Sequence, residues 1–361
     1  MSESASTSPN SLFEAFPRLA GRLPWTSLGA FPTPVEPLTA LSEGTRARLF
    51  VKRDDLSSPR YGGNKVRKLE FLLADASRYD CRTLITLGGI GSNHALATTI
   101  HGGLLGMQVD LALYDQPPSS FVTRNLHACL AAGARPHYAG NIVRAFLTSR
   151  RLYDARRRSG DAPYFVMVGG TSLLGCLGHV SAALELAEQV RRGELPEPDR
   201  VVVPLGTCGT AAGLIAGLRL AGLRTRVVAV RVADPISANG FVLRHLTQRV
   251  LGFLHQHDPA VPRLRIGLRD FDLVTDHFGP GYGHPTPEAE DAISRAESRL
   301  VLEPTYSGKA LASCLDLCRR SDAERTVLFW NTFNSAALPE RTSPPEPPTE
   351  LPPELRRHLA T

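Results

Sequence analysis

The stretch "VVVPLGTCGTAAGLIAGL", residues 201–218, decides the fold class of this chain. An apolar, β-branched run predicts a buried strand, a glycine-rich turn from Gly206 to Thr210 follows, and the remaining residues are typical of a helix. Backbone N–H groups of such a turn converge with the helix dipole on one point, which suits a phosphate dianion. The hydroxyls of Thr207 and Thr210 can donate to the same group. Taken alone, the pattern fits a tight turn without a ligand equally well.

The alternation of strand and helix continues along the chain. Strands are predicted at residues 83–89, 109–115, 164–170, 200–206, 226–232 and 326–332, and helices at 178–192, 210–221 and 237–256. This order predicts an α/β fold with mostly parallel sheets that helices cover on both faces. Ligands of such folds bind beyond the carboxyl ends of the strands, and three of these strands end there in glycine-rich turns.

Composition indicates a globular protein. The chain has 361 residues, 42% of them hydrophobic, which is enough for one large or two smaller domains. No apolar run approaches the ~20 residues of a membrane-spanning helix, and the first residues lack the pattern of a secretory signal, so a cytoplasmic location is predicted. Residues 1–10 are serine-rich and predicted to be disordered. The tail, residues 339–361, is so rich in proline that no packed helix or strand is expected in most of it.

Other classes of protein find little support. The glycines at 206, 209 and 213 do not have the spacing of a dinucleotide-binding loop or of an ATP-binding P-loop, which argues against a nicotinamide dehydrogenase. The formal charge of +6 is spread along the chain, so no nucleic-acid partner is predicted. The six cysteines lack CxxC spacing, so no metal is predicted, and Cys314 and Cys318 are interpreted as small buried hydrophobes.

Lys65 is the candidate for chemistry in "YGGNKVRKLE", residues 61–70. Two glycines and an asparagine precede it where a loop is predicted to become a helix, and Arg67 and Lys68 follow it. A helix N-terminus and neighbouring cations both disfavour a charged amine. The sequence therefore predicts a lowered pKa for Lys65.

Polar residues follow other turns as well. Residues 88–94, "GGIGSNH", place Ser92, Asn93 and His94 at a strand exit, where the first two serve equally well as helix N-caps and the histidine as a structural residue. Tyr282 and Tyr306 each stand among turn-forming residues just before a helix. A single loop tyrosine is usually a packing residue, so these two raise the odds of a functional site only modestly.

Five segments together resemble one family of enzymes. They are "KRDDLSSPRYGGNKVRKLE" (52–70), "GGIGSNHALATT" (88–99), "GTCGTAAG" (206–213), "GYGHPTPEAEDA" (281–292) and "EPTYSGKA" (303–310). They resemble the pyridoxal-phosphate enzymes of the 1-aminocyclopropane-1-carboxylate deaminase and D-cysteine desulfhydrase family, which have the tryptophan-synthase-β-like fold, fold type II. The resemblance covers roughly residues 20–335, with the motifs in the family's order.

The resemblance implies an architecture. A large domain formed by residues 11–65 and 179–338 would pack on a small domain of residues 66–178, each a mostly parallel twisted sheet flanked by helices. Pyridoxal 5'-phosphate would bind between them. A homodimer that acts on an amino-acid substrate, with no membrane partner, is likewise implied by the family.

The resemblance also implies roles for single residues. Lys65 resembles the lysine that forms the Schiff base with the cofactor, Ser92 would lie near the substrate's carboxylate, and Tyr282 and Tyr306 match the two tyrosines that face the substrate. The remaining residues implied to bind the cofactor contact its phosphate or its ring: Lys68, Gly206, Thr207, Cys208, Gly209 and Thr210 at the phosphate, Asn93 at the 3-hydroxyl, and Ser307 and Thr332 near the ring.

Two positions resemble the desulfhydrase side of the family. The deaminases carry Glu where this chain has Ser307, and tend to carry Leu where it has Thr332. The implied function is therefore a lyase that eliminates a leaving group from the β-carbon of an amino acid, D-cysteine being the leading case, and yields pyruvate and ammonia. The alternative is deamination of 1-aminocyclopropane-1-carboxylate. A cofactor-binding protein without turnover is a third reading, against which the retained Lys65, Ser92 and tyrosines argue.

Two departures from the family leave the substrate open. Residues 331–334 read Asn-Thr-Phe-Asn where family members usually have His-Thr-Gly-Gly, so Phe333 and Asn334 are expected to shrink or reshape the pocket. Cysteate, diaminopropionate, D-serine and a specialised metabolite are further candidates. Cys208 stands where glycine is common, which is a milder departure.

Overall fold

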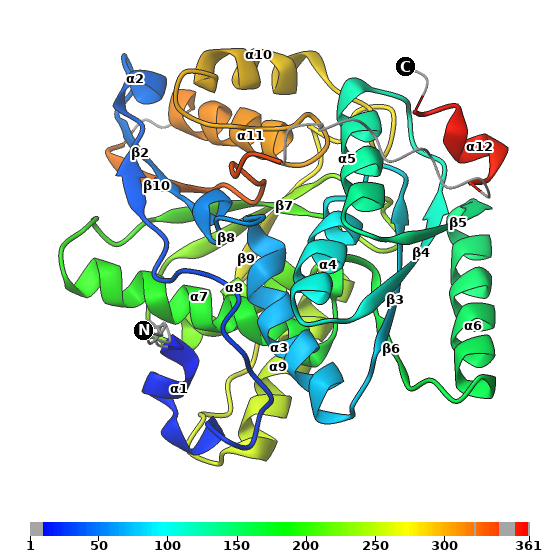
Figure 1. Ribbon diagram of the computed structural model, residues 1–361. Coiled ribbons are helices and arrows are strands. Elements are labelled where there is room, and N and C mark those ends of the chain that lie inside the picture. The colour runs from blue at the N-terminus through cyan, green and yellow to red at the C-terminus, as the bar shows by residue number, and fades with distance from the viewer. Residues whose placement is uncertain (1–9, 321–322, 339–350, 360–361) are drawn as a thin grey trace, which may run out of the picture.

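Two sheets organise the chain in the computed structural model, which describes residues 10–320, 323–338 and 351–359 (Figure 1). The large sheet has the strand order β1-β2-β10-β7-β8-β9, and the small sheet has the order β5-β4-β3-β6. All pairs are parallel except β1 with β2, which is antiparallel. The predicted α/β fold with mostly parallel sheets is confirmed.

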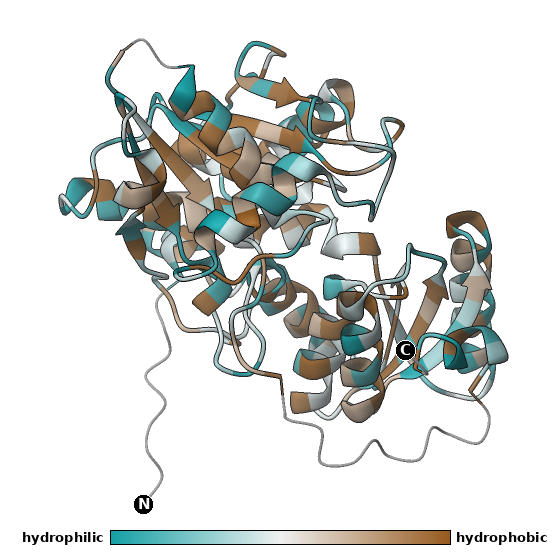
Figure 2. Ribbon diagram, turned by 90° about the horizontal axis from the view of Figure 1, so that it is seen from above, coloured by the Kyte–Doolittle hydropathy of each residue, from teal (hydrophilic) through white to brown (hydrophobic). Residues whose placement is uncertain are grey.

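The strands of the large sheet are β1 (Val35–Pro37), β2 (Ala47–Lys52), β7 (Arg200–Leu205), β8 (Arg226–Arg231), β9 (Phe271–Val274) and β10 (Arg325–Trp330). Those of the small sheet are β3 (Thr83–Gly89), β4 (Gln108–Tyr114), β5 (Arg135–Gly140) and β6 (Pro163–Val166). Their interiors are apolar, as Figure 2 shows by the brown strands at the centre of each sheet. Six of these strands match the predicted ones to within a few residues. The strand predicted at 164–170 ends at Val166, because Gly169 and Gly170 adopt left-handed backbone conformations.

Helices cover both faces of both sheets. On the large sheet, one face packs against α7 (Leu173–Arg191), α8 (Gly209–Leu220) and α9 (Gly240–His257), and the other against α2 (Thr39–Ser42), α10 (Pro287–Ala296) and α11 (Ser307–Arg319). On the small sheet, one face packs against α3 (Asn64–Arg78), α4 (Asn93–Leu104) and α5 (Ser120–Ala131), and the other against α6 (Ile142–Arg158). The predicted covering of both faces is confirmed.

Helix α7 packs against its neighbours at backbone distance. A Cβ atom on Gly178 would lie 2.0 Å from the carbonyl oxygen of Arg67 in α3, and one on Gly213 of α8 would lie 2.4 Å from that of Cys176 in α7. Because glycine has no Cβ, the three helices can approach this closely. Helix α7 therefore packs closely against both α3, which carries Lys65 and Arg67, and α8, which follows the phosphate turn.

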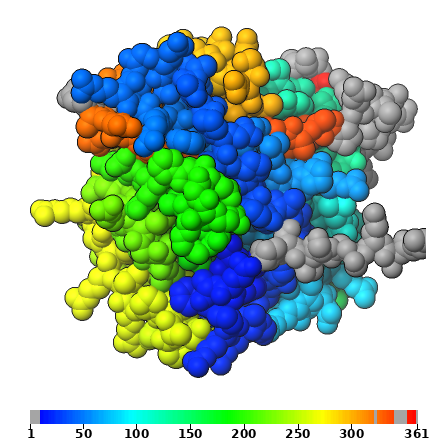
Figure 3. Space-filling model, turned by 90° about the vertical axis from the view of Figure 1, so that its left-hand side faces the viewer, coloured from blue at the N-terminus to red at the C-terminus, as the bar shows by residue number. Residues whose placement is uncertain are grey.

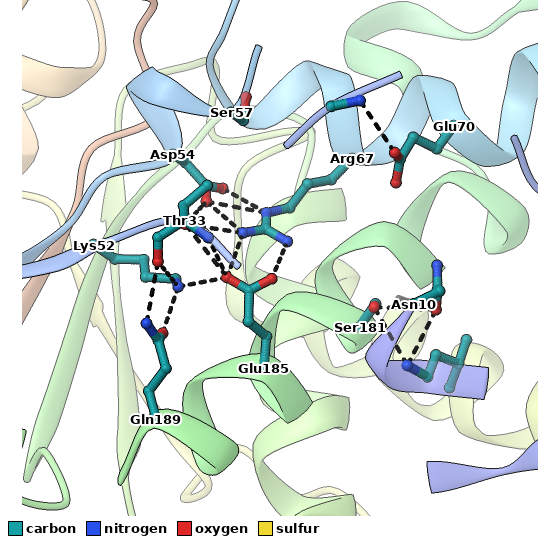
Figure 4. A network of polar contacts seen from close by, with 12 residues as sticks. Asn10, Thr33, Lys52, Asp54, Ser57, Arg67, Glu70, Ser181, Glu185 and Gln189 are labelled. Carbon is teal, nitrogen blue, oxygen red and sulfur yellow. Dashed lines mark hydrogen bonds and ion pairs between the residues drawn. The ribbon is translucent and has the colours of Figure 1, made fainter. Parts of the chain in front are cut away.

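A buried ionic network joins α3 to α7 and β2 (Figure 4). Arg67 donates to Asp54 at 2.8 Å and to Glu185 at 2.9 Å, and Lys52 donates to Glu185 at 2.5 Å. Trp330 at the end of β10 donates to Asp54 at 2.7 Å. Two cations face two carboxylates with almost no exposure to solvent, so every charge has a partner.

The predicted domain boundaries after residues 65 and 178 fall inside helices. The first lies within α3 (Asn64–Arg78) and the second within α7 (Leu173–Arg191). The strands of the small sheet span residues 83–166, and those of the large sheet come from both flanks. The assignment of the two sheets to separate domains stays a prediction.

The two ends of the chain differ in what the structure describes. Of residues 1–10, which are predicted to be disordered, residues 1–9 lie outside the described residues, and the prediction is wrong for Asn10 because its side chain caps a helix. Asn10 caps α1 (Ser11–Ala15), and α1 packs on α7, where the hydroxyl of Ser181 contacts Asn10 and Leu12; Figure 3 shows the N-terminal segment in blue beside α7 in green. The short 3₁₀ helices are η1 (Pro17–Leu19), η2 (Asp54–Leu56) and η3 (Val168–Gly170).

The described part of the proline-rich tail packs against the small sheet. Residues 339–350 and 360–361 lie outside the described residues. Helix α12 (Pro353–Arg356) follows, and the side chains of Leu351 and Leu355 are buried in the core of the small sheet. The tail is expected to lack a packed helix or strand in most of its length, and a helix of four residues leaves that prediction standing.

The cysteines follow the prediction, since all six are free and buried. Cys314 and Cys318 have 0% and 1% of their surface exposed, which confirms their interpretation as small hydrophobes. In the part of the chain that is described, no group of three or more His, Cys, Asp or Glu side chains is arranged to hold a metal ion. None of the described helices has the length and apolar character needed to span a bilayer.

Candidate functional site

A cavity of about 520 Å³ lies where the carboxyl ends of strands from both sheets meet. Gly88, Tyr114 and Gly140 bring the ends of β3, β4 and β5 to its wall. Gly206 after β7 and Thr332 after β10 line it from the large sheet. A site at the carboxyl ends of parallel strands is the position expected for a ligand of such folds.

Lys65 is the second residue of α3 and lines this cavity. Its Nζ donates to Asn64 Oδ1 at 2.9 Å. Burial, and then the charge of Lys68, lower the pKa of Lys65 to about 7. The predicted direction of this shift is confirmed, although burial acts before the neighbouring cation. At neutral pH a large fraction of the amine is free to act as a nucleophile or a base.

The turn before Lys65 is held by the segment that follows β10. Gly62 donates its N–H to Asn334 Oδ1 at 2.6 Å, and Asn64 donates its N–H to the carbonyl oxygen of Thr332 at 3.2 Å. Gly63 has a φ of +90°, and a Cβ there would lie 2.8 Å from the carbonyl oxygens of Thr332 and Phe333. The two residues that depart from the family thus have different places: Asn334 fixes the lysine turn, and Phe333 lines the cavity.

A cradle for a phosphate lies at the N-terminus of α8. Lys68 Nζ donates to the carbonyl oxygen of Gly169 at 3.0 Å, and the hydroxyls of Thr171 and Thr207 are 2.6 Å apart. A Cβ on Gly209 would lie 2.6 Å from Thr171 Oγ1 and 2.8 Å from Lys68 Nζ. The missing side chain therefore leaves open the point where a cation, two hydroxyls and the first N–H groups of a helix converge. This arrangement fits the phosphate of pyridoxal phosphate.

The other residues of the phosphate turn connect it to its surroundings. Thr210 Oγ1 accepts from Asn64 Nδ2 at 3.0 Å, so the turn and the lysine loop are joined. Cys208 has a φ of +63°, a conformation that favours glycine, and its thiol donates to the carbonyl oxygen of Ser237 at 3.3 Å. Burial lowers the pKa of Lys68 to about 8, which still leaves most of this amine charged at pH 7.

Ser92, Asn93 and His94 line the cavity at the start of α4. Ser92 Oγ accepts from the N–H of Ala95 at 3.2 Å, so it is an N-cap as well as a wall residue. Asn93 Oδ1 accepts from Tyr61 at 3.2 Å and from Asn125 at 3.0 Å. Its carbonyl oxygen is thus engaged, and its amide nitrogen is the group that can donate to a ligand.

His94 is a neutral residue of the cavity wall. Its Nε2 lies 3.0 Å from Thr86 Oγ1, and burial, followed by the charges of Lys65 and Lys68, lowers its pKa well below the usual value. A neutral imidazole beside two amines does not compete with Lys65 for a proton at pH 7. The structural reading of His94 is the one this geometry favours.

Tyr282 and Tyr306 meet in the cavity wall. The hydroxyl of Tyr306 donates to that of Tyr282 at 2.8 Å, and the two rings form an edge contact with centroids 6.0 Å apart. Burial raises the pKa of both phenols above the ordinary value for tyrosine. Both therefore stay protonated at physiological pH and can serve as proton donors.

Ser307 is not among the residues that line the cavity, whereas Glu303 is. The Ser307 hydroxyl lies 3.2 Å from Glu303 Oε1, and the carboxylate of Glu303 accepts the N–H groups of Thr305, Tyr306 and Ser307 at 2.8–2.9 Å. Burial raises the pKa of Glu303, and these bonds oppose that rise. The contact between Ser307 and the cofactor ring stays a prediction. Glu303, four residues earlier in the chain, is the acidic residue of this segment that lines the cavity.

Sequence reasoning missed Glu303 and Thr171. Glu303 stands four residues before the first residue of α11 and caps that helix, which is a recognisable position for a carboxylate. Thr171 directly follows the glycines of the third turn, "VGGT", where its hydroxyl is a possible donor to a phosphate. Both residues could have been found by examining every polar side chain within a few positions of those turns.

The lowered pKa of Lys65 predicts how cofactor capture depends on pH. Only the free amine attacks an aldehyde, so the rate at which cofactor-free protein captures pyridoxal phosphate is expected to rise with pH around 7 and to level off about one unit higher. Stopped-flow measurement of the visible absorbance at saturating cofactor gives this profile. A midpoint near 10, the value of an exposed lysine, would contradict the prediction.

Comparison with known proteins agrees with this geometry. The family model described as "Pyridoxal-phosphate dependent enzyme" matches residues 26–332. The chain is 35% identical to a protein named nocardicin C-9' epimerase from Nocardia uniformis subsp. tsuyamanensis, over 93% of this chain and 98% of that protein. It is 33% identical to a protein named D-cysteine desulfhydrase from Klebsiella pneumoniae (strain 342), over 88% and 96% of the two chains. Among solved structures, an ACC deaminase homologue superposes with a TM-score of 0.77 at 28% identity, over 89% and 95% of the two chains.

Proposed function

Because the chain belongs to the family of pyridoxal-phosphate dependent enzymes, we propose that it is a lyase that eliminates a leaving group from the β-carbon of an amino acid, as D-cysteine desulfhydrase does. Its cofactor is pyridoxal 5'-phosphate, which when bound supplies an electron sink for the negative charge that develops at the α-carbon. The observation that carries the proposal is one cavity with a largely free amine, Lys65, and two protonated phenols, Tyr282 and Tyr306.

These residues suit the two proton transfers of an elimination. Lys65 acts as the base that takes the proton from the α-carbon, and the electron pair of that C–H bond forms the double bond to the β-carbon. The bond to the leaving group breaks with its electron pair, and the phenol of Tyr306, hydrogen-bonded to Tyr282, donates the proton that a thiolate or hydroxide leaving group needs. The enamine released in this way is hydrolysed by water to pyruvate and ammonia.

Other chain groups position the reactants in this proposal. Lys68, Thr171, Thr207 and the N-terminus of α8 hold the phosphate, and the amide nitrogen of Asn93 donates to the 3-hydroxyl of the ring. Ser92 at the start of α4 lies where it can receive the substrate's carboxylate. Thr332 lines the cavity beside the lysine turn, and Glu303 lines it just before the start of α11.

Two other reactions have a specific observation in their favour. Deamination of 1-aminocyclopropane-1-carboxylate is supported by the likeness to the ACC deaminase homologue. Inversion at the α-carbon is supported by the 35% identity to the protein named an epimerase, and the tyrosine pair offers an acid that could return a proton. The elimination and the inversion both begin with removal of the α-proton by Lys65, whereas the α-carbon of the cyclopropane acid carries no proton. The products therefore decide among the three reactions.

A panel of substrates tests the proposal. Purified holoprotein is incubated with D- and L-cysteine, D- and L-serine, β-chloro-D-alanine and 1-aminocyclopropane-1-carboxylate. Pyruvate with ammonia from a β-substituted amino acid is expected, whereas 2-oxobutyrate would support the deaminase. Inversion alone, with deuterium from solvent at the α-carbon and no 2-oxo acid, would support the epimerase and overturn the lyase.

Exchanging Tyr306 for Phe is expected to affect poor leaving groups most. The variant keeps the ring and loses the proton donor, so turnover of serine is expected to fall by about 10²-fold, while chloride, which leaves without a proton, is lost with little change. The ratio of rates for serine and β-chloroalanine, measured for this variant and for Tyr282→Phe, isolates the phenol that donates. Equal losses on both substrates would assign Tyr306 to packing.

The proposal extends to the setting of the protein. We propose that it works in the cytoplasm as a homodimer, on the support of the family resemblance. The same support leads us to propose two domains, residues 11–65 with 179–338 and residues 66–178, with the cavity between them. The position of the cavity between two domains is supported by the finding that residues of both sheets line it.

A further inference from the structure

The first two turns of α6 carry apolar side chains that are both exposed and part of the cavity wall. Ile142 and Phe146 line the same cavity as Lys65, yet 46% and 39% of their surfaces are exposed. Four positions apart on a helix, they lie on one face. Side chains that line a cavity and also meet solvent stand at its mouth. Apolar groups in this position cost free energy unless something covers them, which is typical of a binding groove.

The loop between β8 and α9 contributes to the same cavity. Ala233, Asp234 and Ser237 line the cavity. Ile236 stands between the last two in the chain and is 87% exposed, and it is not itself a lining residue. The loop is held in place, because Cys208 donates to the carbonyl oxygen of Ser237 and Arg231 donates to that of Ala238 at 2.9 Å. We call Ile142, Phe146 and Ile236 the apolar rim.

Other apolar side chains line the same cavity as the rim residues Ile142 and Phe146 and the amine of Lys65. Val168 and Phe333 line the cavity as well. Phe333 is fixed by the ring of Phe121 in α5, at a centroid distance of 5.6 Å. Phe333 stands where the family usually has glycine, so the surface in this chain is more apolar than the family pattern predicts. Val168 and Phe333 therefore add apolar surface to the cavity that Lys65 and the rim residues Ile142 and Phe146 also line.

The charges of the cavity select against an anionic substituent. Among the described residues that line the cavity, the cationic side chains are Lys65 and Lys68, which the proposed function assigns to the cofactor. Asp115 and Asp234 line it as well and bring negative charge to its wall, and Asp234 stands two residues before Ile236 of the rim. A sulfonate or carboxylate at the end of the substrate would meet these groups without a cation to pair with.

We propose that the substrate is an amino acid whose β-substituent is uncharged and apolar, of the size of an S-benzyl or S-aryl group, and that this substituent lies on the apolar rim. The proposal rests on the proposed function for the identity of the reacting end, and goes beyond it by placing free cysteine, serine and cysteate among the poor substrates. The bond that breaks is the one from the β-carbon to sulfur, and the apolar thiolate leaves with the electron pair and is protonated.

Selectivity between two thioethers tests the proposal on the holoprotein. The kcat/KM for S-benzylcysteine is expected to exceed that for S-methylcysteine by about tenfold or more in the configuration that is turned over, as burial of a phenyl group implies. Phe146→Ala is expected to reduce this ratio by about tenfold. The matched control is Leu147→Ala on the same helix, since Leu147 is 55% exposed but does not line the cavity, and this variant is expected to keep the wild-type ratio.

Binding of unreactive analogues separates this proposal from the proposed function. 2-Amino-5-phenylpentanoate has the length of S-benzylcysteine without a leaving group, and norvaline is its short counterpart. Calorimetry on the holoprotein is expected to show about tenfold tighter binding of the phenyl compound, lost in Phe146→Ala and kept in Leu147→Ala. If this preference appears while no substrate gives a 2-oxo acid, binding of an apolar substituent at the rim is supported and the proposed lyase activity is contradicted.

Two results would contradict the proposal that the apolar rim binds the β-substituent of the substrate. One is an equal affinity for both analogues together with equal kcat/KM values for both thioethers. The other is a change of sedimentation coefficient in Phe146→Ala with an unchanged selectivity ratio, which would show that a second copy of the chain covers these side chains.

Discussion

Replacing Lys65 with alanine is expected to reduce turnover by about 10³-fold or more and to abolish covalent attachment of the cofactor. The variant loses the nucleophile that bonds to the aldehyde and the base that takes the α-proton, and no neighbouring group replaces it. His94 is neutral with its Nε2 on Thr86, and Lys68 is engaged with Gly169 at the phosphate cradle. The measurement is steady-state turnover together with the mass of the protein after borohydride reduction.

The small number of lysines makes the mass measurement decisive. The chain has four, at positions 52, 65, 68 and 309, and Lys52 and Lys309 are fully buried at other contacts. Reduced wild-type protein should carry one added cofactor mass on the peptide with Lys65. Lys65→Arg, which keeps the positive charge but not the nucleophile, is the matched control and should behave like Lys65→Ala. Added mass on Lys68, or on the alanine variant, would show that the reactive amine is elsewhere.

Replacing Glu185 with alanine is expected to destabilise the protein by about 3–5 kcal/mol, because it leaves the charges of Lys52 and Arg67 buried without their shared partner. Urea unfolding followed by fluorescence and circular dichroism measures the free energy of unfolding. Asp154→Ala is the control: it removes the partner of Arg150 in an ion pair whose side chains are 77% and 43% exposed, and should cost less than about 0.5 kcal/mol.

The pH dependence of stability gives a second signature of Glu185. Burial alone would raise the pKa of this carboxyl, but Arg67 and Lys52 outweigh it and lower the pKa to about 2. The stabilisation from the charged carboxylate is therefore complete above the unfolded pKa of about 4.5 and is lost as the pH falls toward 2. The stability of Glu185→Ala should fall less steeply in that interval than that of the native protein. Parallel curves would show that the network does not act through this charge.

Sequence reasoning was most successful where strands carry their own signal. The strand at Thr83–Gly89 and the strand at Arg200–Leu205 are buried apolar runs that end at glycine, so both the element and the turn could be predicted. The strand at Val35–Pro37 has three residues and a proline, and the one at Arg135–Gly140 reads "RPHYAG". Neither shows the alternation that marks a strand, and both lie at sheet edges, where pairing on one side is enough.

The site was predictable only in its local parts. Lys65 and the phosphate turn are marked by glycines next to them in the chain. The contacts that hold these parts in place are not marked in the sequence nearby. Asn334, which accepts the N–H of Gly62, lies 272 residues from it, and the ion-pair partners Arg67 and Glu185 lie 118 residues apart. Contacts of this kind depend on how the helices pack, which no short-range pattern encodes. The apolar rim likewise arises only when α6 and the loop before α9 are brought to one cavity.

The place of β10 in the large sheet has a consequence for synthesis of the protein. Strand β10 lies between β2 and β7 and is paired with both, so within the large sheet it joins the strand that precedes the Lys65 segment to the strand that precedes the phosphate turn. All strands of the small sheet emerge from the ribosome long before it. The nascent chain can therefore form the small sheet early, but it acquires a place for the cofactor only after residue 334 has been translated.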